Sequence, residues 1–251
     1  MVFEVTVMSD ASDLNDDPGD LDALIRRVDP DRWISSRFIP DPQVRADVIA
    51  LYAFDHELAR APKVASNPLI GEIRLTWWRE ALDEIFEGRP VRRHPTAEAL
   101  AGAVARRGLE RDPLERMIDA RYRLLDAQPM SKDEAVEFAA DSAGAAAAAA
   151  VAVLDPSYVE YSADATSWAA LWGMSLLWLN DRIAPDAEQS FLAELDLSLE
   201  EARTIERGAA PPKAFPAVAH ATLARSYRRH RNPGALEKRL RVTLAVARGA
   251  I

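Results

Sequence analysis

The sequence has 251 residues, of which 49% are hydrophobic and 28% are charged, with a formal net charge of −9. This length allows one large domain or two small ones with a buried core, and the composition is typical of a globular protein. The acidic balance argues against a nucleic-acid-binding role, and the absence of cysteine excludes disulfides, iron–sulfur ligation and thiolate zinc sites. The first ten residues show no secretory signal, so we expect a cytoplasmic protein.

The N-terminal residues 1–19 are acidic, polar and rich in turn residues, which predicts a flexible tail. A first helix is expected next, with one apolar face formed by Leu21, Leu24, Ile25 and Val28. The following segment, DPDRWISSRF at 29–38, is predicted to turn the chain towards a pair of longer helices.

The first helix of that pair begins at Asp41, a capping residue, with Pro42 in the first turn. Steps of three and four residues then place five side chains on one face: Val44, Val48, Leu51, Asp55 and Leu58. Asp55 is a carboxylate at a position where a core residue is expected, so it is a candidate functional residue.

The second helix of the pair begins at the capping residue Asn67 and ends near Gly88. Its predicted inward stripe is Ile70, Ile73, Trp77, Ala81 and Ile85. The adjacent tryptophans Trp77 and Trp78 diverge by about 100° around a helix, so this segment is expected to contact neighbours on two sides.

Two helices are expected after a basic loop, at 96–107 and from Asp112 onwards. The second has a face formed by Leu114, Met117, Ile118, Arg121 and Leu125. Ser131 and Glu134 form a capping box before an alanine-rich helix that runs to Leu154. Its small side chains fit either close helix packing or a wide ligand tunnel, and the run 143–154 is too short and too alanine-rich to span a bilayer.

The last third of the chain is also predicted to be helical. The expected segments are 164–183, a short helix after a capping box at Ser198 and Glu201 that ends at Gly208, 217–231 with the basic cluster RSYRRHR, and 235–248. No stretch alternates like a strand, and no glycine-rich phosphate loop or paired-histidine metal spacing occurs. These patterns predict an all-α fold of about nine helices in one domain, 20–251, with no cofactor or metal.

Five segments together resemble the squalene/phytoene synthase family: LYAFDHELAR, GEIRLTWWREALDEIFEG, MIDARYRLL, the Ala143–Gly144 step and LRVTLAVARGAI. The resemblance runs from about Leu21 to the C-terminus. It is closest to a divergent bacterial branch similar to the mitochondrial complex I assembly factor 6. It implies an isoprenoid-synthase-type helical bundle around a central cavity that holds two prenyl diphosphates.

The resemblance also implies where metal-binding carboxylates belong. Active synthases carry two aspartate-rich motifs whose Mg²⁺ ions assist departure of the diphosphate. Read in register from Tyr52, the first motif falls on Ala59, Arg60 and Lys63. The second falls on residues 173–180, where Leu176, Leu179 and Asn180 replace the family's asparagine, arginine and aspartate, and Asp181 lies one position beyond.

Eight residues are therefore candidates for lining the cavity or binding a ligand: Asp55, Glu57, Arg60, Lys63, Arg74, Trp78, Asn180 and Asp181. Asp55 either faces a ligand or retained metal, or is a buried carboxylate bonded to Arg74 or Arg79. Arg60 and Lys63 either bind a phosphate without metal or form a solvated helix end. The tryptophan pair is either core or a substrate platform.

Three functions remain open. The first is a non-catalytic family member that acts through protein or lipid contacts, as an assembly factor for respiratory complex I at the inner membrane face. The second is an active Mg²⁺-dependent transferase that joins two prenyl diphosphates head to head. The third is a protein that binds a prenyl diphosphate without turnover. The expected partners are a protein or a prenyl lipid, and the RSYRRHR cluster suits an acidic partner, an anionic lipid or plain solvation.

Overall fold

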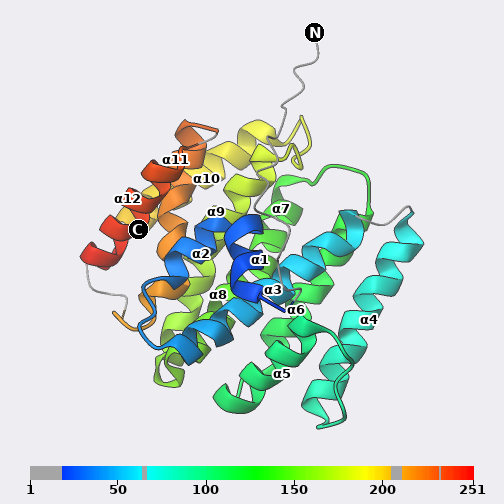
Figure 1. The fold of residues 1–251 in the computed structure, drawn as a ribbon. Coiled ribbons are helices and arrows are strands. Elements are labelled where there is room, and N and C mark those ends of the chain that lie inside the picture. Colours follow the sequence, from blue (N-terminus) through cyan, green and yellow to red (C-terminus); the bar gives the residue numbers. More distant parts are fainter. Residues whose placement is uncertain (1–18, 64–66, 205–210, 232) are drawn as a thin grey trace, which may run out of the picture.

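The computed structural model describes residues 19–63, 67–204, 211–231 and 233–251. These residues form a helical bundle, and β pairing within them is limited to one isolated bridge between Met130 and Ile183 (Figure 1). The prediction of an all-α fold is confirmed. The α-helices are α1 (Leu21–Val28), α2 (Pro30–Ser36), α3 (Pro42–Lys63), α4 (Pro68–Phe86), α5 (Pro95–Arg107), α6 (Arg111–Tyr122), α7 (Lys132–Ala139), α8 (Ala145–Leu154), α9 (Ser162–Leu179), α10 (Glu188–Thr204), α11 (Ala224–Arg229) and α12 (Ala235–Arg248).

The core of the bundle is built around α3, α8 and α9. Helix α3 packs against α1, α4, α5 and α8, and α9 packs against α8 and α11. In the view of Figure 1, α4 stands at the right edge and α12 at the left edge, with the core helices between them. The two outermost helices therefore present their outer faces on different sides of the molecule.

The local start and stop signals in the sequence are confirmed. The Asp41 carboxylate accepts hydrogen bonds from the amides of Gln43 and Val44, and the Asn67 side chain accepts one from Ile70. Gly88 has φ of +67°, the left-handed conformation that favours glycine at a helix end. Both bonds of the Ser131–Glu134 capping box form.

The alanine-rich segment is one continuous helical run in which α7 and α8 are joined by a π-helical turn, η3 (Ala140–Gly144). A Cβ on Gly144 would lie 2.7 Å from Thr166 Cγ2 and 2.9 Å from the Thr166 carbonyl oxygen. Small residues are therefore needed here for close packing against α9. The run 132–154 is long and apolar enough to cross a membrane, but 67% of its apolar window is buried inside the bundle, as expected of a core helix.

Two predicted elements and the predicted number of helices were wrong. The segment 29–38 is not a turn, because Asp29 caps α2 there. Helix α10 begins at Glu188, so Ser198 lies inside it and starts no new helix; Phe191, Leu195 and Leu199 are buried at steps of four and carry the helix through that point. The described residues contain twelve α-helices, more than the nine expected.

The other differences concern helix ends and faces. Residues 214–221 are buried, and 3₁₀ turns replace the first half of the helix expected at 217–231, whereas α11 forms in the second half. Helix α9 stops at Leu179. Helix α4 buries Leu75 and Trp78, whereas Ile73, which was expected to face inwards, is 60% exposed. The helix is apolar on two adjacent faces, so the spacing of its apolar residues did not indicate which face is buried. Gly208 and most of the predicted tail lie outside the described residues.

Candidate functional site

A cavity of about 480 Å³ opens among α2, α3, α6, α9, α11 and α12. Apolar side chains, among them Leu124, Phe138 and Leu176, form part of its wall. The rest of the wall is charged, with three carboxylates and four cations that come from four helices, the cap of α2 and the loop after α9: Asp29, Asp31, Arg32, Asp55, Arg121, Arg182 and Lys238. The predicted central cavity is therefore present, and its polar wall is close to neutral.

Asp55 lies at the centre of the charged wall and is only 5% exposed. Arg32 Nη2 donates to its Oδ2 over 2.6 Å, and Arg121 Nη2 donates to its Oδ1. Burial alone would raise the pKa of Asp55, but Arg121 and Arg32 outweigh it and hold the pKa well below its usual range. Asp55 is therefore an anion clamped between two buried cations.

The short helix α2 places Arg32 in this cluster. The Asp29 side chain caps α2 by accepting a hydrogen bond from the Arg32 amide, and it also accepts from Arg32 Nε. The guanidinium lies 4.8 Å from the ring centroid of Tyr52 and 5.2 Å from that of Trp172, distances suited to cation–π contact. Arg32 is thus held by two carboxylates and two aromatic rings.

Two nitrogens in this cluster remain without a partner. Among the described residues, neither Arg32 Nη1 nor Arg121 Nε has a hydrogen-bond acceptor, although both atoms are buried. Buried charged groups of this kind are costly unless an acceptor is supplied. Both arginines line the cavity, so its wall carries two buried nitrogens whose hydrogen bonds are unmade.

A second carboxylate, Asp31, ties α9, α11 and α12 to the same cavity. Its Oδ2 accepts hydrogen bonds from Trp172 Nε1 over 3.0 Å and from the Tyr227 hydroxyl over 2.5 Å. Lys238 Nζ donates to Tyr227 and lies 2.9 Å from Asp31 Oδ1. His220 packs edge-on against Trp172, and burial, with the nearby Arg32, lowers its pKa to about 3, so His220 is neutral near pH 7.

Two of the eight candidate residues, Asp55 and Asn180, line the cavity. Ala59 and Leu176 line it too, so the wall where the resemblance places both aspartate-rich motifs carries a methyl group, a leucine and an amide. Of the other motif positions, Arg60 and Leu179 do not line the cavity, and the side chain of Lys63 lies outside the described residues.

The other candidates lie elsewhere or outside the described side chains. Glu57 pairs with the exposed Arg60, 2.9 Å apart, and neither lines the cavity. Arg74 is exposed on α4. Trp78 packs in the core against Phe54 and Trp77, as expected of a core residue. Asp181, at φ of +53°, pairs with Arg231 over 3.3 Å, and the Lys63 side chain lies outside the described residues.

The partners proposed for Asp55 were wrong. Arg74 does not reach it, and Arg79 pairs with Asp119 instead. The true partners were missed because 29–38 was interpreted as a turn and Arg121 as part of a helix face. One signal was available in the sequence. Arg121 interrupts an apolar stripe on α6, just as Asp55 interrupts one on α3, and two opposite charges at such inward positions can form a buried ion pair.

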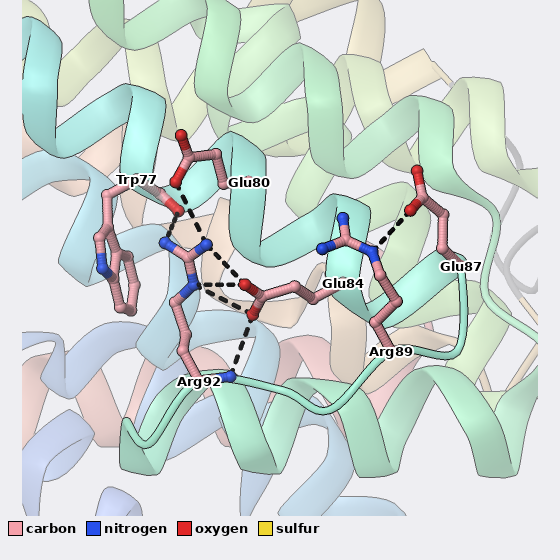
Figure 2. Close-up of polar contacts among 6 residues, drawn as sticks. All are labelled: Trp77, Glu80, Glu84, Glu87, Arg89 and Arg92. Carbon is pink, nitrogen blue, oxygen red and sulfur yellow. Dashed lines mark hydrogen bonds and ion pairs between the residues drawn. The ribbon is translucent and has the colours of Figure 1, made fainter.

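A separate polar cluster joins α4 to the loop before α5 (Figure 2). Arg92 donates through Nε and Nη2 to the Glu84 carboxylate, through Nη2 to Glu80 and through Nη1 to the Trp77 carbonyl. Its guanidinium also lies 4.6 Å from the Trp77 ring centroid. Since the side-chain nitrogens of Arg92 all have acceptors, this cluster, here called the α4 clamp, is a structural contact.

The sequence profile described as squalene/phytoene synthase matches residues 25–180, more than half of the chain. The chain belongs to the squalene/phytoene synthase family. A crystal structure of a dehydrosqualene synthase in complex with a ligand has a similar fold, with a TM-score of 0.70 over 90% of this chain and 94% of that one at 12% identity. At that identity the similarity concerns the fold alone.

The chain is also similar to curated relatives named NADH dehydrogenase (ubiquinone) complex I, assembly factor 6. The cattle protein is 33% identical and the human protein 32% identical, each over 103 residues. That stretch is 41% of this chain and 30% of the length of each relative. The proteins similar to this chain therefore include a synthase, by fold, and assembly factors, by sequence.

The cavity of this family member does not fit Mg²⁺. A magnesium site needs oxygen ligands in near-octahedral geometry, commonly one or two free carboxylates beside substrate phosphates. Here Asp29, Asp31 and Asp55 are each engaged by a cation. Throughout the described part of the chain, no group of three His, Cys, Asp or Glu side chains could hold a metal ion.

Proposed function

We propose that this chain is a non-catalytic member of the squalene/phytoene synthase family that acts through protein or lipid contacts, as an assembly factor for respiratory complex I. The observation that carries the proposal is the cavity wall at Ala59, Leu176 and Asn180, which has no carboxylate where the resemblance places the aspartate-rich motifs. Without such carboxylates the protein cannot hold the metal ions that assist diphosphate departure.

The charges that remain in the cavity support the same proposal. Asp55 faces Arg32 and Arg121 at ion-pair distance, and Asp31 faces Lys238. A metal ion at either carboxylate would have to displace these cations and leave them buried without a counter-charge. Breaking a buried ion pair in this way costs about 3–5 kcal/mol. The wall is therefore arranged for ion pairing within the protein.

Turnover is the direct test. Purified protein is incubated with farnesyl or geranylgeranyl diphosphate and Mg²⁺, and pyrophosphate release is followed. We expect no release above a heat-denatured control. Turnover at ordinary enzyme rates, roughly 1 per second or more, would contradict the proposal and favour the head-to-head transferase.

The assembly role rests on the similarity to complex I assembly factor 6 and has its own test. Removing the gene from its host is expected to lower the amount of assembled complex I on native gels and the NADH:quinone reductase activity of membranes. Re-expression of the wild-type chain should restore both, and so should an Asn180→Ala variant, since the role does not depend on cavity chemistry. Unchanged complex I in the deletion strain would contradict the assembly role.

A second candidate function is binding of a prenyl diphosphate without turnover. It is favoured by the nitrogens of Arg32 and Arg121 that have no acceptor, because both arginines line the same cavity as the apolar Leu124 and Phe138. Such a site would hold a phosphate on arginine donors and a prenyl chain on the apolar side, without metal.

Trp172 lines the cavity and serves as the probe for this second candidate. We expect farnesyl diphosphate to change the tryptophan fluorescence saturably, with chelator present. Arg121→Gln should weaken binding by roughly tenfold or more, because a charged hydrogen bond is lost. Arg79→Gln, which removes a surface cation outside the cavity, is the matched control. No saturable change, or equal loss in both variants, would remove the second candidate.

A further inference from the structure

Helix α12 carries an apolar face that points away from the bundle. Its inner residues Val242 and Ala245 are buried, and the helix packs against α2 and the 3₁₀ turn at Ala219–Leu223. On the opposite side Leu236, Leu240 and Leu244 follow one another at steps of four and are 71%, 56% and 48% exposed. Three large apolar side chains aligned on one exposed face are more than scattered surface residues and indicate an interaction surface.

Arginines border this leucine stripe on both sides. At about 100° per residue, Arg239 and Arg248 fall on opposite flanks of the stripe. Both are exposed, and neither forms an ion pair with another described residue. The acidic residue on this part of the helix, Glu237, is already paired with Arg241 over 2.8 Å. The flanks are therefore positively charged in a chain whose net charge is −9.

A pocket of about 300 Å³ adjoins the N-terminal end of the stripe. Arg26, Trp33, Pro233, Lys238 and Arg239 belong to its lining, and no carboxylate does. The Arg26 guanidinium lies 5.4 Å from the Trp33 ring centroid and has no ion-pair partner among the described residues. Two cations without counter-charges, Arg26 and Arg239, thus line one small pocket beside Leu236. A pocket of this charge and size fits a phosphate group.

We propose that the α12 face, defined as Leu236, Leu240 and Leu244 with Arg26, Arg239 and Arg248, docks on an anionic phospholipid membrane. The leucines enter the headgroup–acyl boundary, while the arginines contact lipid phosphates and the pocket receives a headgroup. This arrangement of apolar stripe and flanking cations matches helices that lie in the membrane interface.

The shape of the surface favours a membrane over a protein partner. A stable protein interface buries about 800 Å² on each partner, over roughly 20–30 residues. The apolar part of the α12 face is only three partly exposed leucines on one helix, and the rest of the face is three arginines. The inference gives a site to the lipid contacts of the proposed function. It does not rest on the loss of catalysis, because the α12 face lies outside the cavity and a catalytically active protein could dock in the same way.

Flotation with vesicles tests the proposal on the full chain. Wild-type protein is expected to float with vesicles that contain phosphatidylglycerol and not with pure phosphatidylcholine vesicles, and added salt should release it. The variant L236Q/L240Q/L244Q should bind these vesicles at least about tenfold more weakly than wild type. The variant R26Q/R239Q should lose about fivefold in partitioning for each arginine removed.

The matched control is L69Q/I73Q, which removes two side chains of α4 that are 62% and 60% exposed. It should bind anionic vesicles like wild type. Circular dichroism checks that each variant is folded, which is expected because the replaced side chains are at the surface. The proposal is overturned if wild type ignores anionic vesicles, if it binds neutral vesicles equally well, or if the α4 control loses as much as the α12 variants. It is also overturned if the leucine variant only changes the oligomeric state in size-exclusion chromatography, which would assign the face to a second copy.

Discussion

The two arginine-centred clusters of this protein differ in what they leave unsatisfied. In the α4 clamp, Arg92 has an acceptor for each side-chain nitrogen and lies near the surface (Figure 2). In the cavity, Arg32 and Arg121 share Asp55 and are buried, yet each keeps one nitrogen without an acceptor.

The difference separates a structural contact from a candidate site. The clamp contacts lie within one helix and the loop that follows it, so they stabilise the packing of neighbouring parts of the chain. They leave no side-chain nitrogen of Arg92 free for a ligand. The cavity cluster joins α2, α3 and α6. Two of its buried nitrogens have no acceptor, and both belong to arginines that line the cavity. Spare buried donors are retained at a cost in stability, which is a feature of functional sites.

The largest expected effect comes from Asp55→Asn. Removing the charge leaves two buried arginines without their shared anion, so we expect a loss of about 3–5 kcal/mol in the free energy of unfolding, measured by urea at pH 7. Asp47→Asn is the matched control. Its carboxylate is equally buried, but its partners Arg106 and Arg107 reach water, with side chains 45% and 25% exposed. If Asp47→Asn lowers the free energy of unfolding as much as Asp55→Asn does, the burial of the partner arginines is not what makes Asp55 important.

A smaller effect is expected from His220, which belongs to the cavity cluster. Burial lowers its pKa from 6.5 to about 3, so between these two pH values His220 is protonated in the unfolded chain and neutral in the folded chain. Its contribution to stability is therefore present above pH 6.5 and is lost as the pH falls towards 3. Between pH 7 and pH 5 this amounts to roughly 2 kcal/mol.

Urea unfolding at several pH values measures this contribution. His220→Gln should flatten the dependence between pH 7 and pH 5 relative to wild type, whatever its stability at pH 7. The same slope in both proteins would mean that His220 does not titrate on unfolding in this range.

The smallest effect is expected in the α4 clamp. Arg92 holds the pKa of Glu84 at about 2 through hydrogen bonds, but the pair is close to water. Arg92→Ala should lower the thermal unfolding midpoint by only a few degrees, and high salt should reduce the difference from wild type. A loss of stability larger than that caused by Asp55→Asn would contradict the prediction that the cavity cluster contributes more to stability than the α4 clamp.

Much of the fold could be predicted because its signals are local. Capping residues such as Asp41 and Asn67, the capping box at Ser131 and the glycine at 88 each act within one helical turn, and all were confirmed. The errors arose where tertiary burial decided. Ile73 faces solvent because Trp78 packs against Phe54, and α10 runs through Ser198 because Phe191 and Leu195 are buried.

The candidate site was predicted only in part, for the same reason. Ala59, Leu176 and Asn180 were placed in the cavity wall by their register in the resemblance, and they line it. The cations of the site were missed because their partners lie far away in the sequence: Arg32 and Arg121 meet Asp55 across 23 and 66 residues. No helical period can report a contact between two different helices.

The sequence by itself determined that the chain is all-α, where most of its helices begin, and that carboxylates are missing from the positions of the family's aspartate-rich motifs. Only the tertiary structure decided that Asp55 is a clamped anion, that α2 and α12 supply cations to the cavity, and that the leucines of α12 face outwards. Helix formation depends on neighbours within a turn, whereas buried charge pairs and exposed faces depend on which helices meet.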